Sequence, residues 1–273
     1  MRMTPQDMKH ALDALGLEPD GPERYGFDQV TVSGPARTAD GRPVWVRAAG
    51  IPEPPLWPRP DAIGEASRTL AGAVRMPRVL DTFDWARWDE HYDREGTARA
   101  YVFERVTEAP VSDTPNLTTD PNLSESWWSG LRQAHDAIAA ADWAGPARPK
   151  RRFLVRLRRV LGPGTDAARV PWVPQHGDFH WANLLSGDAP TVVDWEGYSY
   201  APRGLDAASL LVYSLTHPPT AARVRQEYTD VLTGEHGRLV QIYACVSVMT
   251  AVRAGYYTDL GPAIRDHMAA LIS

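Results

Sequence analysis

Cysteine is nearly absent from this sequence, because Cys245 is the single cysteine among 273 residues. One thiol cannot form an internal disulfide or a cysteine cluster for zinc, and its apolar surroundings predict a buried thiol in a reducing compartment. The chain also has no H-E-x-x-H and no G-x-S-x-G motif. Zinc proteases and serine hydrolases are therefore without support.

Long apolar segments are lacking as well. The longest one, residues 239–252, contains Gln241 and is followed by Arg253, so it is too short to cross a bilayer and is typical of a buried helix. The first residues lack the apolar core of a signal peptide. We therefore expect a cytoplasmic protein that has no membrane partner.

Positive charge is not in excess, because 29 Lys and Arg stand against 34 Asp and Glu, for a net charge of -5. Such a chain does not need a nucleic acid as partner. Residues 148–159 are an exception, with seven basic residues and no acidic one, which raises a nucleic-acid alternative. Apolar residues recur there at helical spacing, however: Phe153, Leu154, Leu157 and Leu161. This pattern favours an amphipathic helix with a solvated basic face.

The first part of the chain combines a helix with the alternating pattern of a small sheet. Thr4-Pro5-Gln6-Asp7 is typical of a helix start, because Thr4 can cap the helix and Asp7 can close a capping box. Gly16 can end this helix. Asp40-Gly41 predicts a hairpin turn, which leads into a strand over residues 44–47.

A proline-rich loop over residues 51–60 comes next. It is followed by Asp61, which we expect to cap a helix that contains Glu65. Two further strands and the acidic, aromatic segment that separates them are predicted at 79–83, 100–105 and 84–95.

After residue 106 the pattern becomes mainly helical. Helices are predicted over six segments: 124–142, 150–161, 205–215, 219–232, 236–254 and 261–272. We therefore predict an α+β fold of two lobes. An N-terminal lobe of antiparallel sheet with one helix would span residues 1–106, and a mainly helical C-terminal lobe would span residues 107–273.

The most informative segment is His176-Gly177-Asp178-Phe179-His180-Trp181-Ala182-Asn183, with Asp194 eleven residues beyond its end. Residues 184–185 and 191–193 can pair as a hairpin, which would bring Asn183 and Asp194 together at one end. An Asn carbonyl and an Asp carboxylate are the hard oxygen ligands that Mg²⁺ prefers. Asp178 is then placed to orient an attacking hydroxyl and accept its proton, as phosphoryl transfer requires.

The pattern H-G-D-x-x-x-x-N followed by V-D-W-E resembles the aminoglycoside phosphotransferase and choline kinase family, which has a protein-kinase-like fold. Pro202-Arg203-Gly204-Leu205-Asp206 is similar to the family's G-x-P-x-x-D-L segment, with the order altered and Asp206 in place. Upstream, residues 131–135 resemble the helix before the catalytic loop. Residues 101–106 resemble the strand and hinge that hold the adenine. The strong part of the resemblance covers residues 172–212.

This resemblance implies a bilobal kinase-like fold with the active site between the lobes. It implies that Asp178 is the catalytic base, that Asn183 and Asp194 hold Mg²⁺, and that His176 braces the loop. Glu104 and Val106 would lie against the adenine of ATP or GTP.

The acceptor implied by the resemblance is a hydroxyl of a small molecule, such as an antibiotic or a metabolite. His180 stands where Ser/Thr protein kinases place a lysine, which argues against a protein substrate. The C-terminal helices have mixed charge, so we expect an acceptor less cationic than an aminoglycoside. The predicted assembly is a monomer or a homodimer.

The sequence departs from the family in the N-terminal lobe. The third strand of such kinases carries a Lys that contacts the phosphates and pairs with a helix Glu. Here the corresponding residue is Arg47, and Glu65 is its natural partner. Arginine is always charged and can bind phosphate, although with a different geometry. An alternative therefore stays open, in which the chain is a catalytically weak or inactive relative that binds a nucleotide or another ligand.

Overall fold

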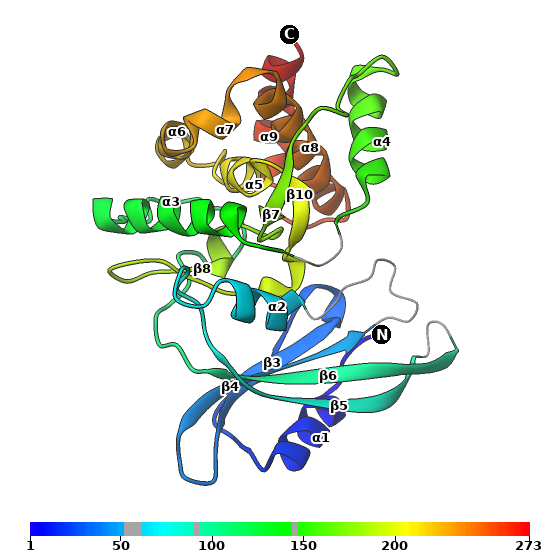
Figure 1. Ribbon diagram of the computed structural model, residues 1–273, viewed down its shortest axis with the longest axis vertical. Coiled ribbons are helices and arrows are strands. Elements are labelled where there is room, and N and C mark those ends of the chain that lie inside the picture. The colour runs from blue at the N-terminus through cyan, green and yellow to red at the C-terminus, as the bar shows by residue number, and fades with distance from the viewer. Residues whose placement is uncertain (52–61, 90–92, 144–146) are drawn as a thin grey trace. The chain divides into compact units, whose positions relative to one another are not determined.

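The computed structural model describes residues 1–51, 62–89, 93–143 and 147–273, so the predicted helix cap at Asp61 lies outside the described residues. The chain divides into two compact units, and Figure 1 labels many of their helices and strands. The first unit comprises Met1–Arg59 and Pro77–Thr107, and the second comprises Pro60–Met76 and Glu108–Ser273.

Helix α2, Ala62–Thr69, belongs to the second unit. The division predicted at residue 106 assigns this helix to the N-terminal lobe, so the compact units differ from that division here. The physical reason is that the end of α2 and the turn after it bond to the second unit. Thr69 Oγ1 lies 3.3 Å from the Tyr198 hydroxyl, and the Val192 amide donates to the Arg75 carbonyl at 2.9 Å.

The first unit begins with helix α1, Pro5–Leu15, as the sequence predicts. The Asp7 carboxylate accepts hydrogen bonds from the Thr4 amide and hydroxyl, both at 2.7 Å, which completes the predicted capping box. Gly16 ends the helix in the left-handed region at φ 63°.

An antiparallel sheet follows, with the strand order β1-β3-β4-β6-β5 and with β2 paired to β3. Its strands are β1 Glu18–Pro19, β2 Arg24–Tyr25, β3 Thr31–Arg37, β4 Pro43–Ile51, β5 Val79–Asp89 and β6 Arg94–Glu104, and the short 3-10 helix η1 covers Phe27–Gln29. The β3–β4 hairpin turns at the predicted Asp40-Gly41, where Gly41 has a φ of 83°.

Strands β5 and β6 are much longer than predicted. Residues 84–89 and 94–95, expected to lie in a segment that separates two short strands, belong to β5 and β6; residues 90–92 are outside the described residues. Cross-strand pairing explains the difference, because the Asp84 carboxylate opposite Arg99 accepts two guanidinium hydrogen bonds at 2.6 and 2.7 Å. From the sequence we expected this acidic segment to separate the strands. In the structure its residue Asp84 instead pairs with a basic residue on the neighbouring strand.

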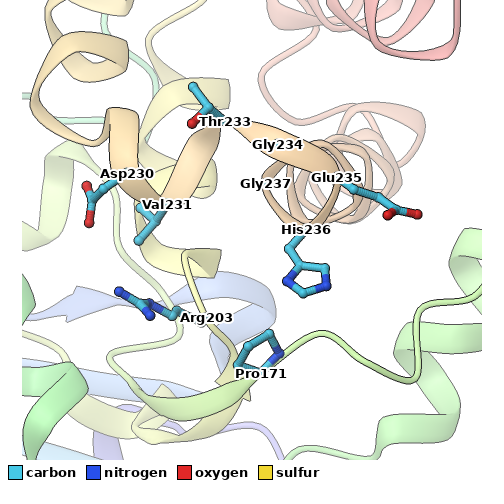
Figure 2. A pocket seen from close by; sticks show the side chains of 9 residues that line it. All are labelled: Pro171, Arg203, Asp230, Val231, Thr233, Gly234, Glu235, His236 and Gly237. Carbon is cyan, nitrogen blue, oxygen red and sulfur yellow. The ribbon is translucent and has the colours of Figure 1, made fainter.

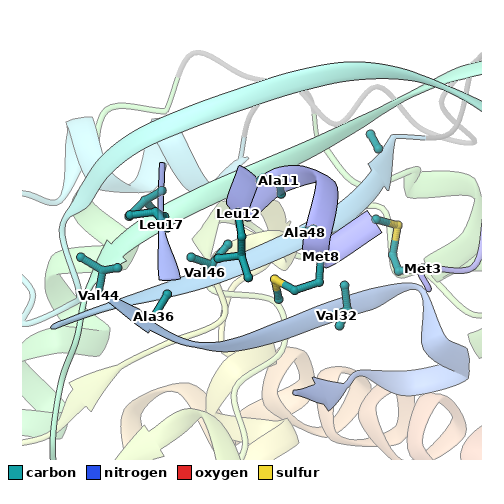
Figure 3. Packing of buried hydrophobic residues seen from close by; sticks show 13 residues of the cluster. Met3, Met8, Ala11, Leu12, Leu17, Val32, Ala36, Val44, Val46 and Ala48 are labelled. Carbon is teal, nitrogen blue, oxygen red and sulfur yellow. The ribbon is translucent and has the colours of Figure 1, made fainter. Parts of the chain in front are cut away.

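The core of the first unit lies between α1 and one face of the sheet (Figure 3). Met8 and Leu12 of the helix pack against the buried side chains of Val32, Val44 and Val46. Because side chains alternate along a strand, burial of residues 44, 46 and 48 turns residues 45 and 47 to the opposite face. The predicted phosphate contact at position 47 therefore lies on the face that α1 leaves uncovered.

The second unit is mainly helical, as predicted. After α2 its helices are α3 Glu125–Ala140, α4 Lys150–Leu161, α5 Leu205–Tyr213, α6 Pro218–Glu227, α7 Thr229–Leu232, α8 Gly234–Arg253 and α9 Leu260–Ile272. The helix predicted over 219–232 is two helices, because the backbone breaks at Tyr228, at φ -113° and ψ 26°. Among the described residues, none of the helices has the length and apolar character needed to cross a membrane.

Two short sheets interrupt the helices of the second unit and frame its loops. Strand β7, Trp172–Gln175, pairs with β10, Ser199–Pro202, and β8, Leu184–Leu185, pairs with β9, Thr191–Val192. The 3-10 helices η2, Trp181–Asn183, and η3, Trp195–Gly197, lie beside the second pair in the sequence.

Aromatic and aliphatic side chains form the core of the second unit. Trp127 and Trp181 are fully buried, with rings stacked 6.4 Å apart, so they pack inside the unit instead of facing a ligand. Helix α4 buries Phe153 and Leu157, which confirms the predicted amphipathic helix. Cys245 is buried in α8, as predicted.

Candidate active site

The backbone of the loop that begins at His176 is held by Asp206, in the first turn of α5. The Asp206 carboxylate accepts hydrogen bonds from the amides of His176 at 2.7 Å and Gly177 at 2.9 Å. Its own amide donates to Gln175 Oε1 at 3.0 Å. Asp206 is completely buried, so these hydrogen bonds are shielded from water. The segment Pro202–Asp206 therefore supports the candidate site indirectly, because it fixes the backbone of the loop that carries Asp178.

His176 joins this loop to the residue before Asp194. Its Nε2 lies 2.9 Å from the Val193 carbonyl, and its Nδ1 accepts from the Asp178 amide at 3.3 Å. Complete burial lowers the pKa of His176, although nearby carboxylates oppose this. A neutral imidazole with its proton on Nε2 satisfies both contacts.

Arg148 is a residue that the sequence analysis missed. Its Nη2 donates to the carbonyl oxygens of Gly177 at 2.7 Å and Gly197 at 3.1 Å, and its Nε donates to Ser199 Oγ at 3.1 Å. It thus clamps two loops together. In the sequence Arg148 was only one member of a basic segment, and no local signal separates it from the solvated arginines of α4.

Gly177 is required by this clamp. Its φ of 84° lies in the left-handed region, and a Cβ there would overlap Arg148 Nη2 and the Gly197 carbonyl oxygen. The glycine of the H-G-D motif is therefore explained by the close approach of two loops.

The β8–β9 hairpin has the predicted form. Leu184 pairs with Val192, and the Val193 amide donates to the Asn183 carbonyl at 3.0 Å. Asn183 and Asp194 consequently lie at the same end of the hairpin, as the sequence predicted. Asp194 has a left-handed backbone, at φ 66°, which is uncommon outside glycine and often found at functional positions.

Asn183 is also in contact with Asp178. Its Nδ2 donates to the Asp178 carbonyl at 2.9 Å and lies 3.4 Å from Asp178 Oδ2. With the amide nitrogen directed to Asp178, Oδ1 is the atom that Asn183 can offer to a cation. The structure therefore brings the predicted base and one predicted metal ligand together.

The Asp178 side chain is 53% exposed, and its Oδ2 lies 3.4 Å from His180 Nε2. Partial burial raises the pKa of Asp178, but the hydrogen bond with His180 and the charges around it, including Arg148, lower it by more, to about 2. The group is thus a carboxylate at neutral pH. It can orient a hydroxyl and accept its proton once the oxygen has begun to bond to phosphorus.

The donor set suits Mg²⁺ bound together with a nucleotide. Within the described ranges there is no group of three or more His, Cys, Asp or Glu that could hold a metal ion alone. Mg²⁺ usually takes one or two protein oxygens and completes its octahedron with phosphates and water. Asn183 Oδ1 and the Asp194 carboxylate fit that requirement.

Three predicted nucleotide contacts belong to the first unit. Arg47 lies in β4, in register with Tyr101 of β6. Glu104 is the last residue of β6, where it is exposed and forms an ion pair with Arg78 at 3.0 Å. Val106 is half-buried in the segment that follows.

Glu65, the predicted partner of Arg47, lies in α2 and thus in the second unit. Its carboxylate accepts from Arg68 Nη2 at 2.6 Å, one helical turn further on. An exposed pair of this kind contributes little stability, so Glu65 can exchange its partner at small cost. The pairing of Glu65 with Arg47 stays a prediction.

A cavity of about 400 Å³ opens elsewhere in the second unit, at the N-terminus of α8 (Figure 2). It is lined by Pro171, Arg203, Asp230, Val231, Thr233, Gly234, Glu235, His236 and Gly237. None of the predicted site residues lines this cavity, so it is distinct from the candidate active site.

Comparison with protein families decides the assignment. A model described as the phosphotransferase enzyme family matches residues 51–239, more than half of the chain, and this range includes Asp178, Asn183 and Asp194. The chain belongs to the phosphotransferase enzyme family. The prediction that it is a phosphotransferase is thereby confirmed. Arg47 lies just before residue 51, where the match to the family model begins.

Solved structures of small-molecule kinases share the fold of this phosphotransferase. A thermostable mutant of aminoglycoside phosphotransferase APH(4)-Ia, in ternary complex with AMP-PNP and hygromycin B, is 14% identical, with 98% of each chain covered and a TM-score of 0.66. Amicoumacin kinase hAmiN, in complex with AMP-PNP, Ca²⁺ and Ami, is 10% identical, with 99% of this chain and 94% of that chain covered and a TM-score of 0.60.

Macrolide 2'-phosphotransferase MphH from Brachybacterium faecium is 16% identical, with 96% of each chain covered and a TM-score of 0.51. No curated protein matches the sequence significantly. The structural likenesses confirm the predicted α+β kinase-like fold, with its antiparallel sheet and its mainly helical C-terminal part.

The hydrogen bonds of Asp206 lead to a stability prediction. Replacing Asp206 with alanine leaves two buried amides without their acceptor, so the free energy of unfolding should fall by about 3 kcal/mol. Urea denaturation of both proteins measures this change. Asp266→Ala, which removes an exposed carboxylate of α9, is the control and should shift the free energy by less than about 0.5 kcal/mol. Equal stabilities of the two variants would contradict the anchoring role.

Proposed function

We propose that this phosphotransferase transfers the γ-phosphate of ATP or GTP to a hydroxyl of a small molecule, with Mg²⁺ as the metal. The observation that carries the proposal is the contact of Asp178 with Asn183, beside the hairpin end that also carries Asp194. A carboxylate, an amide oxygen and a second carboxylate are thereby concentrated at one end of a two-stranded hairpin. The similar kinase structures hold AMP-PNP together with hygromycin B in one case and with Ca²⁺ and Ami in the other, which supports this proposal.

In the proposed reaction Asp178 aligns the acceptor hydroxyl. Because its pKa of about 2 makes it a weak base, its main contribution is to hold the hydroxyl oxygen in line with the phosphorus. It accepts the proton late, when the attacking oxygen has become acidic. His180 and Asn183 fix the carboxylate in position for this.

Asn183 Oδ1 and the Asp194 carboxylate would hold Mg²⁺, which when bound neutralises phosphate charge and polarises the bond to the leaving group. Arg47 is proposed to contact the nucleotide phosphates from the face of β4 opposite α1, with Glu65 as its counter-charge. The backbone from Glu104 to Val106 is proposed to hydrogen-bond the adenine or guanine.

The proposal is tested by nucleotide consumption with purified protein. Either ATP or GTP is incubated with Mg²⁺ and a panel of acceptor alcohols that contains neutral glycosides, macrolides, choline and kanamycin, and released ADP or GDP is measured. We expect turnover that depends on one acceptor class and stops on addition of EDTA. Selective turnover of kanamycin would contradict the expected low positive charge of the acceptor.

The alternative of a non-catalytic relative rests on Arg47 in the place of the family's lysine. It predicts thermal stabilisation by Mg²⁺-nucleotide without product in any reaction of the panel. Acceptor-dependent product formation that disappears in Asp178→Asn would exclude this alternative.

A further inference from the structure

A row of aromatic rings begins at the side chain that contacts Asp178. The His180 ring meets the edge of Tyr213, the last residue of α5, with ring centroids 5.5 Å apart. Tyr213 in turn lies perpendicular to Tyr257, at 6.2 Å, and Tyr257 lies 6.2 Å from Tyr256. The row ends at the surface, because Tyr256 is 40% exposed. All four residues belong to the second unit.

The backbone presents Tyr257 in an unusual conformation. Tyr257 lies between α8 and α9 with a φ of 48°, a left-handed value that is strained for a bulky residue. The turn is pinned by Asp259, whose carboxylate accepts from the buried Asn116 Nδ2 at 2.8 Å. A surrounding structure that maintains this strain fixes the tyrosine in place beside Tyr213.

The segment around Asn116 also connects the row to the candidate active site. The Leu117 amide donates to the Tyr213 carbonyl at 2.9 Å, and the Trp181 amide donates to the Pro115 carbonyl at 3.4 Å. The catalytic loop, the end of α5 and the α8–α9 turn thus share one supporting segment, residues 115–117. A molecule bound on the tyrosines would therefore be held in a fixed relation to Asp178.

The protonation state of the tyrosines indicates which ligands the row can bind. Burial raises the pKa of Tyr213 and Tyr257, and the Asp178 carboxylate raises both further. Both phenols are thus neutral donors close enough to Asp178 to sense its charge. The Asp259 carboxylate, two residues beyond Tyr257, accepts a hydrogen bond from Asn116 and is therefore less available to a cationic ligand. Neutral phenols beside aromatic faces suit a ring with an apolar face and several hydroxyls.

We propose that Tyr213, Tyr257 and Tyr256 form the acceptor subsite, and that its ligand is a neutral hydroxylated ring such as a glycoside. The ring packs on Tyr257 and Tyr256, and the Tyr213 hydroxyl donates to a substituent next to the reacting hydroxyl. The inference rests on the proposed function, because it needs Asp178 to face the reacting group. It adds to that function the residues that select the acceptor and the chemical class of acceptor that they bind.

The test uses p-nitrophenyl β-D-glucopyranoside as the neutral ring, with choline and kanamycin as cationic probes. Phosphorylation of each is measured with the full chain, Mg²⁺ and ATP. We expect saturable turnover of the glucoside, and Tyr257→Ala should raise its KM roughly tenfold while the KM for ATP changes less than about twofold. Tyr257→Phe keeps the ring and should restore most of the glucoside affinity, which separates a binding role from a folding defect.

Tyr25→Ala serves as the matched control, because Tyr25 is an exposed tyrosine of the first unit, and it should leave both KM values unchanged. Preference for choline or kanamycin over the glucoside would overturn the ligand class. An unchanged glucoside KM in Tyr257→Ala would overturn the subsite.

Basal nucleotide hydrolysis, with water as the acceptor, distinguishes a failure of the acceptor subsite from a failure of the proposed function. Hydrolysis that falls in Asp178→Asn but persists in Tyr257→Ala, without turnover of the glucoside, overturns only the acceptor subsite. A wild-type protein that neither hydrolyses the nucleotide nor phosphorylates any acceptor of the panel overturns the proposed function, and the subsite with it.

Discussion

Replacing Asp178 with asparagine is expected to lower kcat for acceptor phosphorylation by ~10²–10⁴-fold. The asparagine has the same shape but carries no negative charge and cannot accept the hydroxyl proton. The KM for the nucleotide should change little, because Asp178 is assigned to the acceptor and not to the phosphates or the metal. Steady-state kinetics with ATP, Mg²⁺ and the acceptor found in the panel measure both quantities.

The matched control for this variant is Asp188→Asn. Asp188 is an exposed residue in the turn of the β8–β9 hairpin, ten positions further along the chain, so the same chemical change is made close to the site without touching it. Its kcat should equal that of the wild type. If Asp178→Asn kept more than about a tenth of the activity, another group would have to orient the hydroxyl.

Asp194→Asn is expected to have the second large effect, a loss of Mg²⁺-dependent nucleotide binding. Losing a carboxylate ligand removes several kcal/mol of charge stabilisation, which corresponds to a fall in kcat/KM on the order of 10³-fold. Asparagine is chosen because Asp194 has a left-handed backbone, which asparagine adopts more readily than most residues. The loss is therefore attributable to the missing charge and not to backbone strain.

Thermal unfolding with ATP, with and without Mg²⁺, measures this effect independently of turnover. The wild type should be stabilised more by ATP with Mg²⁺ than by ATP alone, whereas Asp194→Asn should show no difference between the two. Asp188→Asn should behave as the wild type does. An equal Mg²⁺ dependence in wild type and Asp194→Asn would remove this residue from the metal site.

Local sequence was sufficient where the decisive contacts lie close together in the chain. The capping box at Thr4 and Asp7 and the turn at Asp40-Gly41 depend on residues at most three positions apart. The hairpin that aligns Asn183 with Asp194 joins residues only eleven positions apart in the sequence. Short-range hydrogen bonds and turn geometry are encoded directly by residue type, so these elements were predicted correctly.

Prediction failed where a partner comes from a distant part of the chain. Strands β5 and β6 continue through an acidic segment because Arg99 faces Asp84 across the two strands. Arg148 looked like one more surface arginine, since nothing near it in the sequence shows that it reaches Gly177 and Gly197. Cross-strand pairs and loop contacts of this kind depend on the folded arrangement.

By itself the sequence determined the order of sheet and helices, the family motif and the candidate set Asp178, Asn183 and Asp194, because spacing along one loop and one hairpin carries that information. Only the tertiary structure decided what holds the loop, namely Asp206 and Arg148, and which aromatic side chains stand beside it. The physical reason is that a buried carboxylate, a guanidinium clamp and a row of rings act through contacts between segments far apart in the chain. Residue type alone does not specify such contacts until the core has packed.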